Sequence, residues 1–300
     1  MPSTDWDVLR STMEAFDDAG LTWALLHGSD SFGIGRPSDL DVAIDLASPD
    51  APTRFLSALA RRDLHPLLLW PNDLRGSGLF VASTDLKQGA QIDLLVDPSG
   101  SSKYGIRTSA LLSASTREDW PPRPCPADEW IYSAIKRWMK GQHERLEGLL
   151  AGPPQGVSGR IDEVLRSDRA AVLRELIAGG RPSVRQNLQW RAATSVRLAS
   201  RLASPVGRWF HVVGANDLVV AQELNNRLGR VVLGSTNYRL STSNFTARFG
   251  VHPDLWRARA LVTTGARPLS RRAHHVSALP DWRAATATTS RAFIHWASRS

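Results

Sequence analysis

Two short segments near the N-terminus combine the residue types that bind a metal ion and a phosphate. The first is Leu25-Leu26-His27-Gly28-Ser29, in which an apolar run ends at a Gly-Ser turn. Backbone N–H groups and a hydroxyl at such a turn suit a phosphate. The second, nine residues later, is Asp39-Leu40-Asp41. Alternate residues of a strand share a face, so these two carboxylates would repel each other unless a divalent cation with oxygen ligands lay between them.

A third carboxylate comes from Asp93, near the start of the apolar segment 91–97. An apolar residue, Gly-Ser, a short spacer, Asp-x-Asp and a further acid on a later strand together resemble the signature of the nucleotidyltransferase superfamily, whose fold is of the DNA polymerase β type. The resemblance covers residues 20–100. It implies a magnesium-dependent enzyme that moves a nucleoside monophosphate from an NTP, by family frequency ATP, to a hydroxyl or phosphate acceptor.

The resemblance also assigns roles to individual residues. Asp39, Asp41 and Asp93 would be the catalytic residues and would hold Mg²⁺ or Mn²⁺. Asp93 would also help to deprotonate the acceptor, as in two-metal chemistry at carboxylates. Gly28 and Ser29 would hold the β- and γ-phosphates of the nucleotide.

Basic side chains outside the catalytic strands are further candidates for contact with the nucleotide phosphates. We predict this role for Lys140, with Lys136 and Arg107 as additional candidates. For each of the three, the competing interpretation is an ordinary solvated charge, because most lysines and arginines lie on the surface.

Two other functions stay open. Asp30 places a negative charge beside the expected triphosphate, which favours a catalytically inactive nucleotide-binding or partner-binding module. An arginine-rich C-terminal half favours a toxin-like nucleotidyltransferase that acts on tRNA. The sequence does not identify the acceptor, so antibiotic, sugar phosphate, protein and RNA are all open.

Charge is distributed unevenly along the 300 residues. Residues 1–150 hold 15 Lys and Arg against 21 Asp and Glu, a net charge of −6. Residues 151–300 hold 22 arginines against 8 acids, a net charge of +14. The basic half predicts either a polyanionic partner such as nucleic acid or a face docked against the acidic half, and we favour the docked face.

Composition excludes several classes of protein. A single cysteine, Cys125, excludes an internal disulfide framework. The N-terminus lacks the charged-then-apolar pattern of a signal peptide, and no apolar run is long enough for membrane insertion. With 42% hydrophobic residues the chain can bury a substantial core. A soluble cytoplasmic protein is expected.

Local patterns predict an α/β (α+β) fold in which a mixed-sheet nucleotidyltransferase domain occupies residues 1–120. Its predicted elements are helix 5–19, strands 22–27 and 38–46, helix 52–62, and strands 64–70, 78–83 and 91–96. A helical extension over 121–150 follows, with one helix at 127–150. The Gly- and Pro-rich segment 151–159 is the clearest linker.

The remaining residues, 160–300, predict an arginine-rich α/β domain. Helical patterns over 160–178 and 184–203 precede strand 207–214, helix 216–228 ended by Gly229, and strand 230–234. This order opens a βαβ unit and resembles bacterial proteins that join a nucleotidyltransferase-like domain to a thymidylate-kinase-like P-loop half. A working P-loop reads Gly-x4-Gly-Lys-Ser/Thr. Segment 214–222 has no second glycine, no lysine and no hydroxyl, so we predict a degenerate loop without kinase activity.

Overall fold

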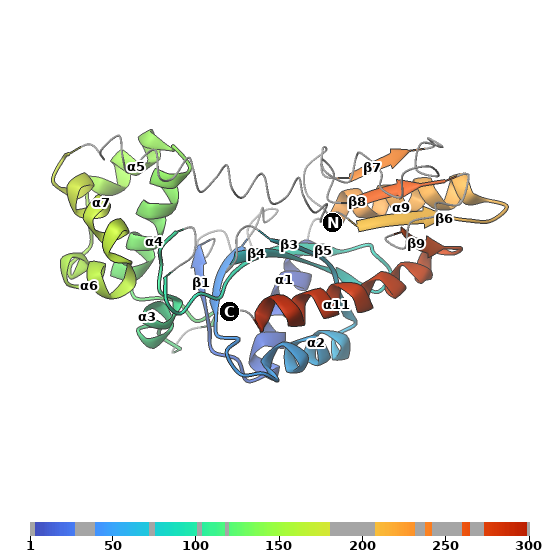
Figure 1. Cartoon of the computed structure of the whole chain (residues 1–300), viewed down its shortest axis with the longest axis horizontal. Coiled ribbons are helices and arrows are strands. Elements are labelled where there is room, and N and C mark those ends of the chain that lie inside the picture. The colour runs from blue at the N-terminus through green and yellow to red at the C-terminus, as the bar shows by residue number, and fades with distance from the viewer. Residues whose placement is uncertain are drawn as a thin grey trace.

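A mixed sheet, a group of helices beside one of its edges and a second, parallel sheet make up the protein (Figure 1). The computed structural model describes residues 4–27, 40–71, 76–100, 104–117, 120–180, 208–231, 238–241, 260–264 and 273–298. This architecture confirms the predicted mixed α/β class. Among the described helices, none has the length and apolar character needed to cross a bilayer.

The N-terminal sheet has the strand order β1-β2-β5-β4-β3. Its strands are β1 (Trp23–His27), β2 (Leu40–Ile44), β3 (Leu64–Pro71), β4 (Gly76–Ser83) and β5 (Gly89–Leu95). The β2–β5 pair is parallel, whereas the other three pairs are antiparallel. Each predicted strand is confirmed, and β2 is buried throughout because helices cover both faces of the sheet at this position.

One face of this sheet is covered by three helices, α1 (Thr4–Asp18), α2 (Ala51–Arg61) and α11 (Ala284–Ala297) (Figure 1). Aromatic rings join them. Phe16 of α1 stacks on Phe55 of α2 with ring centroids 4.8 Å apart, and Phe293 of α11 lies 5.7 Å from Phe55. The last described helix of the chain therefore completes the core of the first sheet.

We expect Phe293→Ala to lower the free energy of unfolding by about 3–5 kcal/mol, because the ring is fully buried in this core. The adjacent Ile294 is 37% exposed, so Ile294→Ala is the matched control and should cost less than about 1 kcal/mol. Urea unfolding followed by tryptophan fluorescence measures both. Equal, small losses in the two variants would show that α11 does not pack on the sheet in solution.

On the opposite face, α3 and α4 contact the sheet and three further helices pack behind them. These helices are α3 (Thr108–Ser113), α4 (Pro126–Met139), α5 (His143–Leu150), α6 (Val157–Val164) and α7 (Ser167–Ile177). The prediction of one helix over 127–150 is wrong, because the chain breaks between α4 and α5. Gly141 adopts a φ of +67°, which an α-helix cannot contain. The N–H groups of Lys140 and Gly141 instead close the last turn of α4.

The segment after α5 also differs from its prediction. Helix α6 begins inside the predicted linker 151–159, and the predicted helix 160–178 is divided between α6 and α7. Between them Leu165 is extended and forms an isolated antiparallel bridge with Ile106. This bridge satisfies backbone groups that a continuous helix would have paired internally, so tertiary pairing decides the break.

The C-terminal sheet is parallel throughout and has the order β7-β8-β6-β9. Its elements are β6 (Arg208–Val212), α9 (Asp217–Val231), β7 (Tyr238–Ser241), β8 (Ala260–Thr263), β9 (Ala273–Val276) and the 3₁₀ helix η3 (Leu279–Arg283). Strand β6 and the helix after it are confirmed. The predicted strand 230–234 is wrong at its start, because α9 continues past Gly229 to Val231. The predicted helix 184–203 lies outside the described residues.

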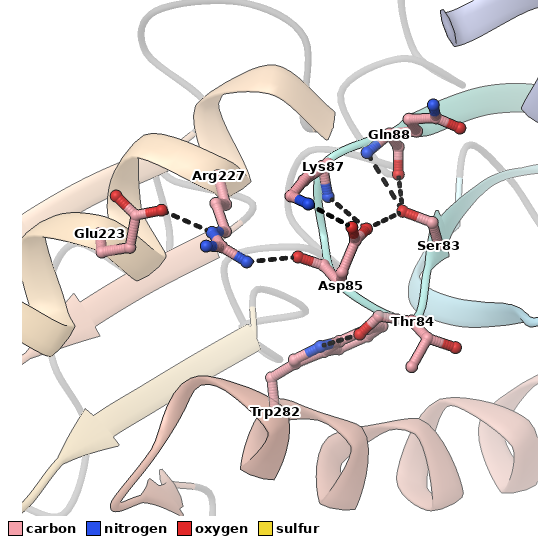
Figure 2. A network of polar contacts seen from close by, with 8 residues as sticks. All are labelled: Ser83, Thr84, Asp85, Lys87, Gln88, Glu223, Arg227 and Trp282. Atoms are coloured by element: carbon pink, nitrogen blue, oxygen red, sulfur yellow. Dashed lines mark hydrogen bonds and ion pairs between the residues drawn. The ribbon is translucent and has the colours of Figure 1, made fainter.

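The turn between β4 and β5 contacts α9 and η3 through uncharged acceptors (Figure 2). Trp282 donates its indole N–H to the carbonyl oxygen of Thr84 at 3.1 Å. Arg227 donates to the carbonyl oxygen of Asp85 at 2.6 Å. The carboxylate of Asp85 instead accepts from Ser83 at 2.8 Å and pairs with Lys87 at 3.1 Å. Both of these hydrogen bonds between the acidic and basic halves therefore end on backbone carbonyl oxygens of the turn.

Apolar packing holds the two sheets together at the same junction. Leu67 and Phe80 of the first sheet share a core with Phe210 and Val262 of the second, and with Trp282. Each of the three apolar cores in the described residues joins segments on both sides of a predicted domain boundary. Apolar burial therefore joins the halves at this junction. Between α4 and α6 they are also joined by charge, because Arg160 of the basic half donates to both carboxylate oxygens of Asp128 of the acidic half, at 2.8 and 2.7 Å.

Candidate active site

Asp41 and Asp93 lie side by side on the two parallel strands of the N-terminal sheet. Their Cα atoms are register partners in the β2–β5 pair, so the two carboxylates leave the same face. Their sequence neighbours Val42 and Leu94 point the other way, into the core beneath α1, α2 and α11. Asp41 is 3% exposed and Asp93 is partly exposed. The sheet thus brings together two of the three predicted carboxylates.

Helix α4 places two further side chains, Tyr132 and Lys136, beside Asp41. They are four residues apart and therefore lie on one side of the helix. Lys136 Nζ forms an ion pair with Asp41 Oδ2 and lies 5.6 Å from the centroid of the Tyr132 ring. The side chains of Lys136 and Asp41 are only 12% and 4% exposed. Lys136 therefore balances the charge of Asp41 in a place that water hardly reaches.

The hydroxyl of Tyr132 is fully buried and has no described partner at full hydrogen-bond geometry, although Asp41 lies close enough to act on it as an acceptor. Burial raises the pKa of Tyr132 well above its usual range, and the negative charges of Asp41 and Asp93 raise it further. The hydroxyl is consequently a neutral donor close to both carboxylates. From the sequence, Tyr132 belongs to a predicted helix, and nothing in the local pattern marks it as part of a site.

The surroundings of Asp93 come from its own strand and from β4. Gln91 Nε2 donates to Asp93 Oδ1 at 2.9 Å. Gly78 is the register partner of Asp93 on β4, and a Cβ at this position would lie 3.1 Å from Asp93 Oδ1. A larger residue at position 78 would push on the carboxylate. The absence of a side chain at Gly78 therefore leaves room for the Asp93 carboxylate, which Gln91 holds by its hydrogen bond.

The predicted phosphate-binding turn and the first aspartate lie outside the described residues. Gly28, Ser29 and Asp39 all belong to the segment between β1 and β2. Its two ends are described: His27 is the register partner of Asp41, and Leu40 begins β2. The described ends of this segment, His27 and Leu40, therefore lie on the strands next to the Asp41–Asp93 pair.

The basic candidates occupy three different environments. Lys136 contacts Asp41, whereas Lys140 lies one turn later, exposed at the C-cap of α4. Arg107 donates to the backbone carbonyl oxygens of Asp162 at 2.6 Å and Glu163 at 3.3 Å, and so ties the start of α3 to α6. Of the three, Lys136 is the one placed at the carboxylates, and the role of Lys140 stays a prediction.

The described carboxylates suit a hard divalent cation. In the ranges that the structure describes, no three His, Cys, Asp or Glu side chains gather as metal ligands. The predicted set of three ligands includes Asp39, which lies outside these ranges. Asp41 and Asp93 supply the oxygen donors that Mg²⁺ and Mn²⁺ prefer. The buried hydroxyl of Tyr132 adds a polar group without adding charge. The residues present therefore fit such an ion.

A separate cavity of about 310 Å³ opens at the far end of the same strands. It is lined by residues of β2, α3 and the adjoining turns, among them Asp45, Val96 and Thr108. Asp45 is four positions after Asp41, which corresponds to about 13 Å along a strand. The cavity is therefore too far from the carboxylates to hold a group that reacts there.

The degenerate P-loop follows β6. Gly214 has a φ of +130° and nothing within 4 Å of where its Cβ would lie. Asp217 stands in the first turn of α9, where a phosphate-binding loop would present N–H groups to an anion. A carboxylate at this position opposes phosphate binding.

No protein-family model matches this sequence, and no curated protein matches it.

Proposed function

We propose that this protein is a nucleotidyltransferase that moves a nucleoside monophosphate from an NTP to a hydroxyl or phosphate acceptor. One observation carries the proposal: Asp41 and Asp93 are register partners on parallel strands, with their carboxylates on one face beneath Tyr132 and Lys136. Paired carboxylates are the residue types that such a transfer needs, and the sequence also supplies a Gly-Ser segment for the phosphates.

Asp41 and Asp93, together with Asp39, would hold Mg²⁺ or Mn²⁺. When bound, the ion offsets the charge of the triphosphate and of the leaving pyrophosphate. Gly28 and Ser29 would contact the phosphates, and Lys140 would add a positive charge from the end of α4.

The chain's own groups can handle the proton of the acceptor. Asp93 is the more exposed of the two described carboxylates, so its oxygens are the ones that an acceptor hydroxyl can reach as general base. The acceptor oxygen bonds to the α-phosphorus, its proton passes to Asp93, and the bond to the β-phosphate oxygen breaks to release pyrophosphate. Gln91 and Gly78 keep the Asp93 carboxylate in place for this step.

Labelling with α-³²P nucleotides tests the proposal. The protein is incubated with Mg²⁺, a cell extract and each NTP in turn, and the protein, RNA and small-molecule fractions are separated. We expect one fraction to gain label with one NTP preferred. Label in RNA would identify a nucleic-acid acceptor for the basic half. No transfer of label to any fraction would overturn the proposal.

The Lys136–Asp41 ion pair favours a second candidate, a nucleotide- or partner-binding module without transfer activity. In such a module Lys136 stays on Asp41 and keeps a metal ion away from it. Nucleotide binding without label transfer would support this candidate.

A further inference from the structure

Lys136 holds the carboxylate that a metal ion would need. Its ammonium is paired with Asp41 Oδ2, and neither side chain is more than 12% exposed. A carboxylate oxygen that is bound to an ammonium cannot bind a divalent cation at the same point, because the two cations repel each other. Metal binding at Asp41 Oδ2 therefore requires that Lys136 leave this oxygen.

A second observation marks the same place as a ligand site. The Tyr132 hydroxyl is fully buried next to the carboxylates and has no described partner at full hydrogen-bond geometry. A buried polar group without a partner is costly. A ligand that brings acceptor oxygens to this position would satisfy the hydroxyl.

We propose that Lys136 is an exchangeable counter-ion: it neutralises Asp41 in the absence of nucleotide, and a divalent cation that arrives with a triphosphate displaces it. This inference rests on the proposed function. The triphosphate supplies the negative charge that the displaced ammonium then pairs with. Metal and nucleotide should therefore bind together, and neither should bind well alone.

The exchange predicts opposite effects of one substitution. Lys136→Met removes the competing charge, so Mn²⁺ without nucleotide should bind at least about tenfold more tightly than in the wild type. The same substitution removes the ammonium that would pair with the triphosphate. In saturating Mn²⁺, α,β-methylene-ATP should therefore bind at least about tenfold more weakly than to the wild type. A side chain that only supported the fold would not change the two affinities in opposite directions.

Two titrations measure these affinities. Free Mn²⁺ is followed by electron paramagnetic resonance, and α,β-methylene-ATP binding by calorimetry. Arg137→Met is the matched control, since it removes a positive charge from the adjacent position of α4 and should leave both affinities unchanged. Lys136→Arg keeps the charge, so Mn²⁺ binding without nucleotide should stay as weak as in the wild type. If Lys136→Met is unfolded in chelator, adding Mn²⁺ should restore its helical circular dichroism, because the ion takes the place of the ammonium.

The possible results distinguish a failure of the exchange from a failure of the proposed function. Mn²⁺ affinity in Lys136→Met that equals the wild-type value, or an unfolded variant that Mn²⁺ does not restore, would overturn the exchange alone. A wild-type protein that binds neither Mn²⁺ nor the nucleotide analogue would overturn the exchange and the proposed function together. Opposite shifts in affinity in a protein that never transfers label would support the exchange and overturn the transfer.

Discussion

Asp93→Asn is expected to lower Mg²⁺-dependent label transfer by about 1000-fold or more, because a carboxylate that holds a metal ion or accepts a proton supplies several kcal/mol to the transition state. The amide keeps an oxygen acceptor for Gln91 and nearly the same volume beside Gly78. The variant should therefore remain folded. Transfer is measured as initial rates of label incorporation, and folding as the melting temperature.

Asp45→Asn is the matched control for this experiment. Asp45 directly follows β2, four residues after Asp41 on the same side of the chain, and is exposed at its turn, where it accepts from the Ala47 N–H at 2.9 Å. It should retain the wild-type rate within a few-fold. Wild-type transfer by Asp93→Asn would remove Asp93 from the site, and equal losses in both variants would point to a general effect of charge.

The second large effect concerns stability and the buried ion pair. Asp41→Asn leaves the Lys136 ammonium without its counter-charge, and Lys136→Met leaves Asp41 without its own, so each should cost about 3–5 kcal/mol in the free energy of unfolding. The double variant has no unpaired charge and should lie within about 2 kcal/mol of the wild type. Urea unfolding in the presence of chelator, so that metal does not contribute, gives all four values.

This expectation reverses the one that the sequence alone supports. Between neighbouring carboxylates, removing Asp41 would relieve repulsion and stabilise the protein. In the structure, the buried Lys136 ammonium has Asp41 as its counter-charge, so removing Asp41 leaves a buried positive charge unpaired. Additive losses in the double variant, with no recovery, would show that Lys136 and Asp41 do not interact in solution.

The sequence by itself determined the strands and the side of each strand on which its acid lies. Alternation of side chains is a local property, so β2 and β5 and the position of Asp41 and Asp93 on them follow from the residues alone. Helices α1 and α2 follow from helical spacing in the same way. The pairing of Asp41 with Asp93 was instead expected from the resemblance to nucleotidyltransferases, because β2 and β5 are distant in the sequence.

Only the tertiary structure decided which basic side chain meets the carboxylates. Lys136 and Lys140 are one turn apart at the end of α4. The sequence does not show which of them reaches Asp41, because Lys136 and Asp41 are 95 residues apart along the chain. The packing of α4 on the sheet brings Lys136 and Tyr132 to Asp41 and leaves Lys140 at the exposed end beside Gly141. The packing of α11 on the first sheet is likewise a contact between segments far apart in the sequence. Contacts between distant segments depend on how whole apolar faces fit together, and local periodicity does not contain that information.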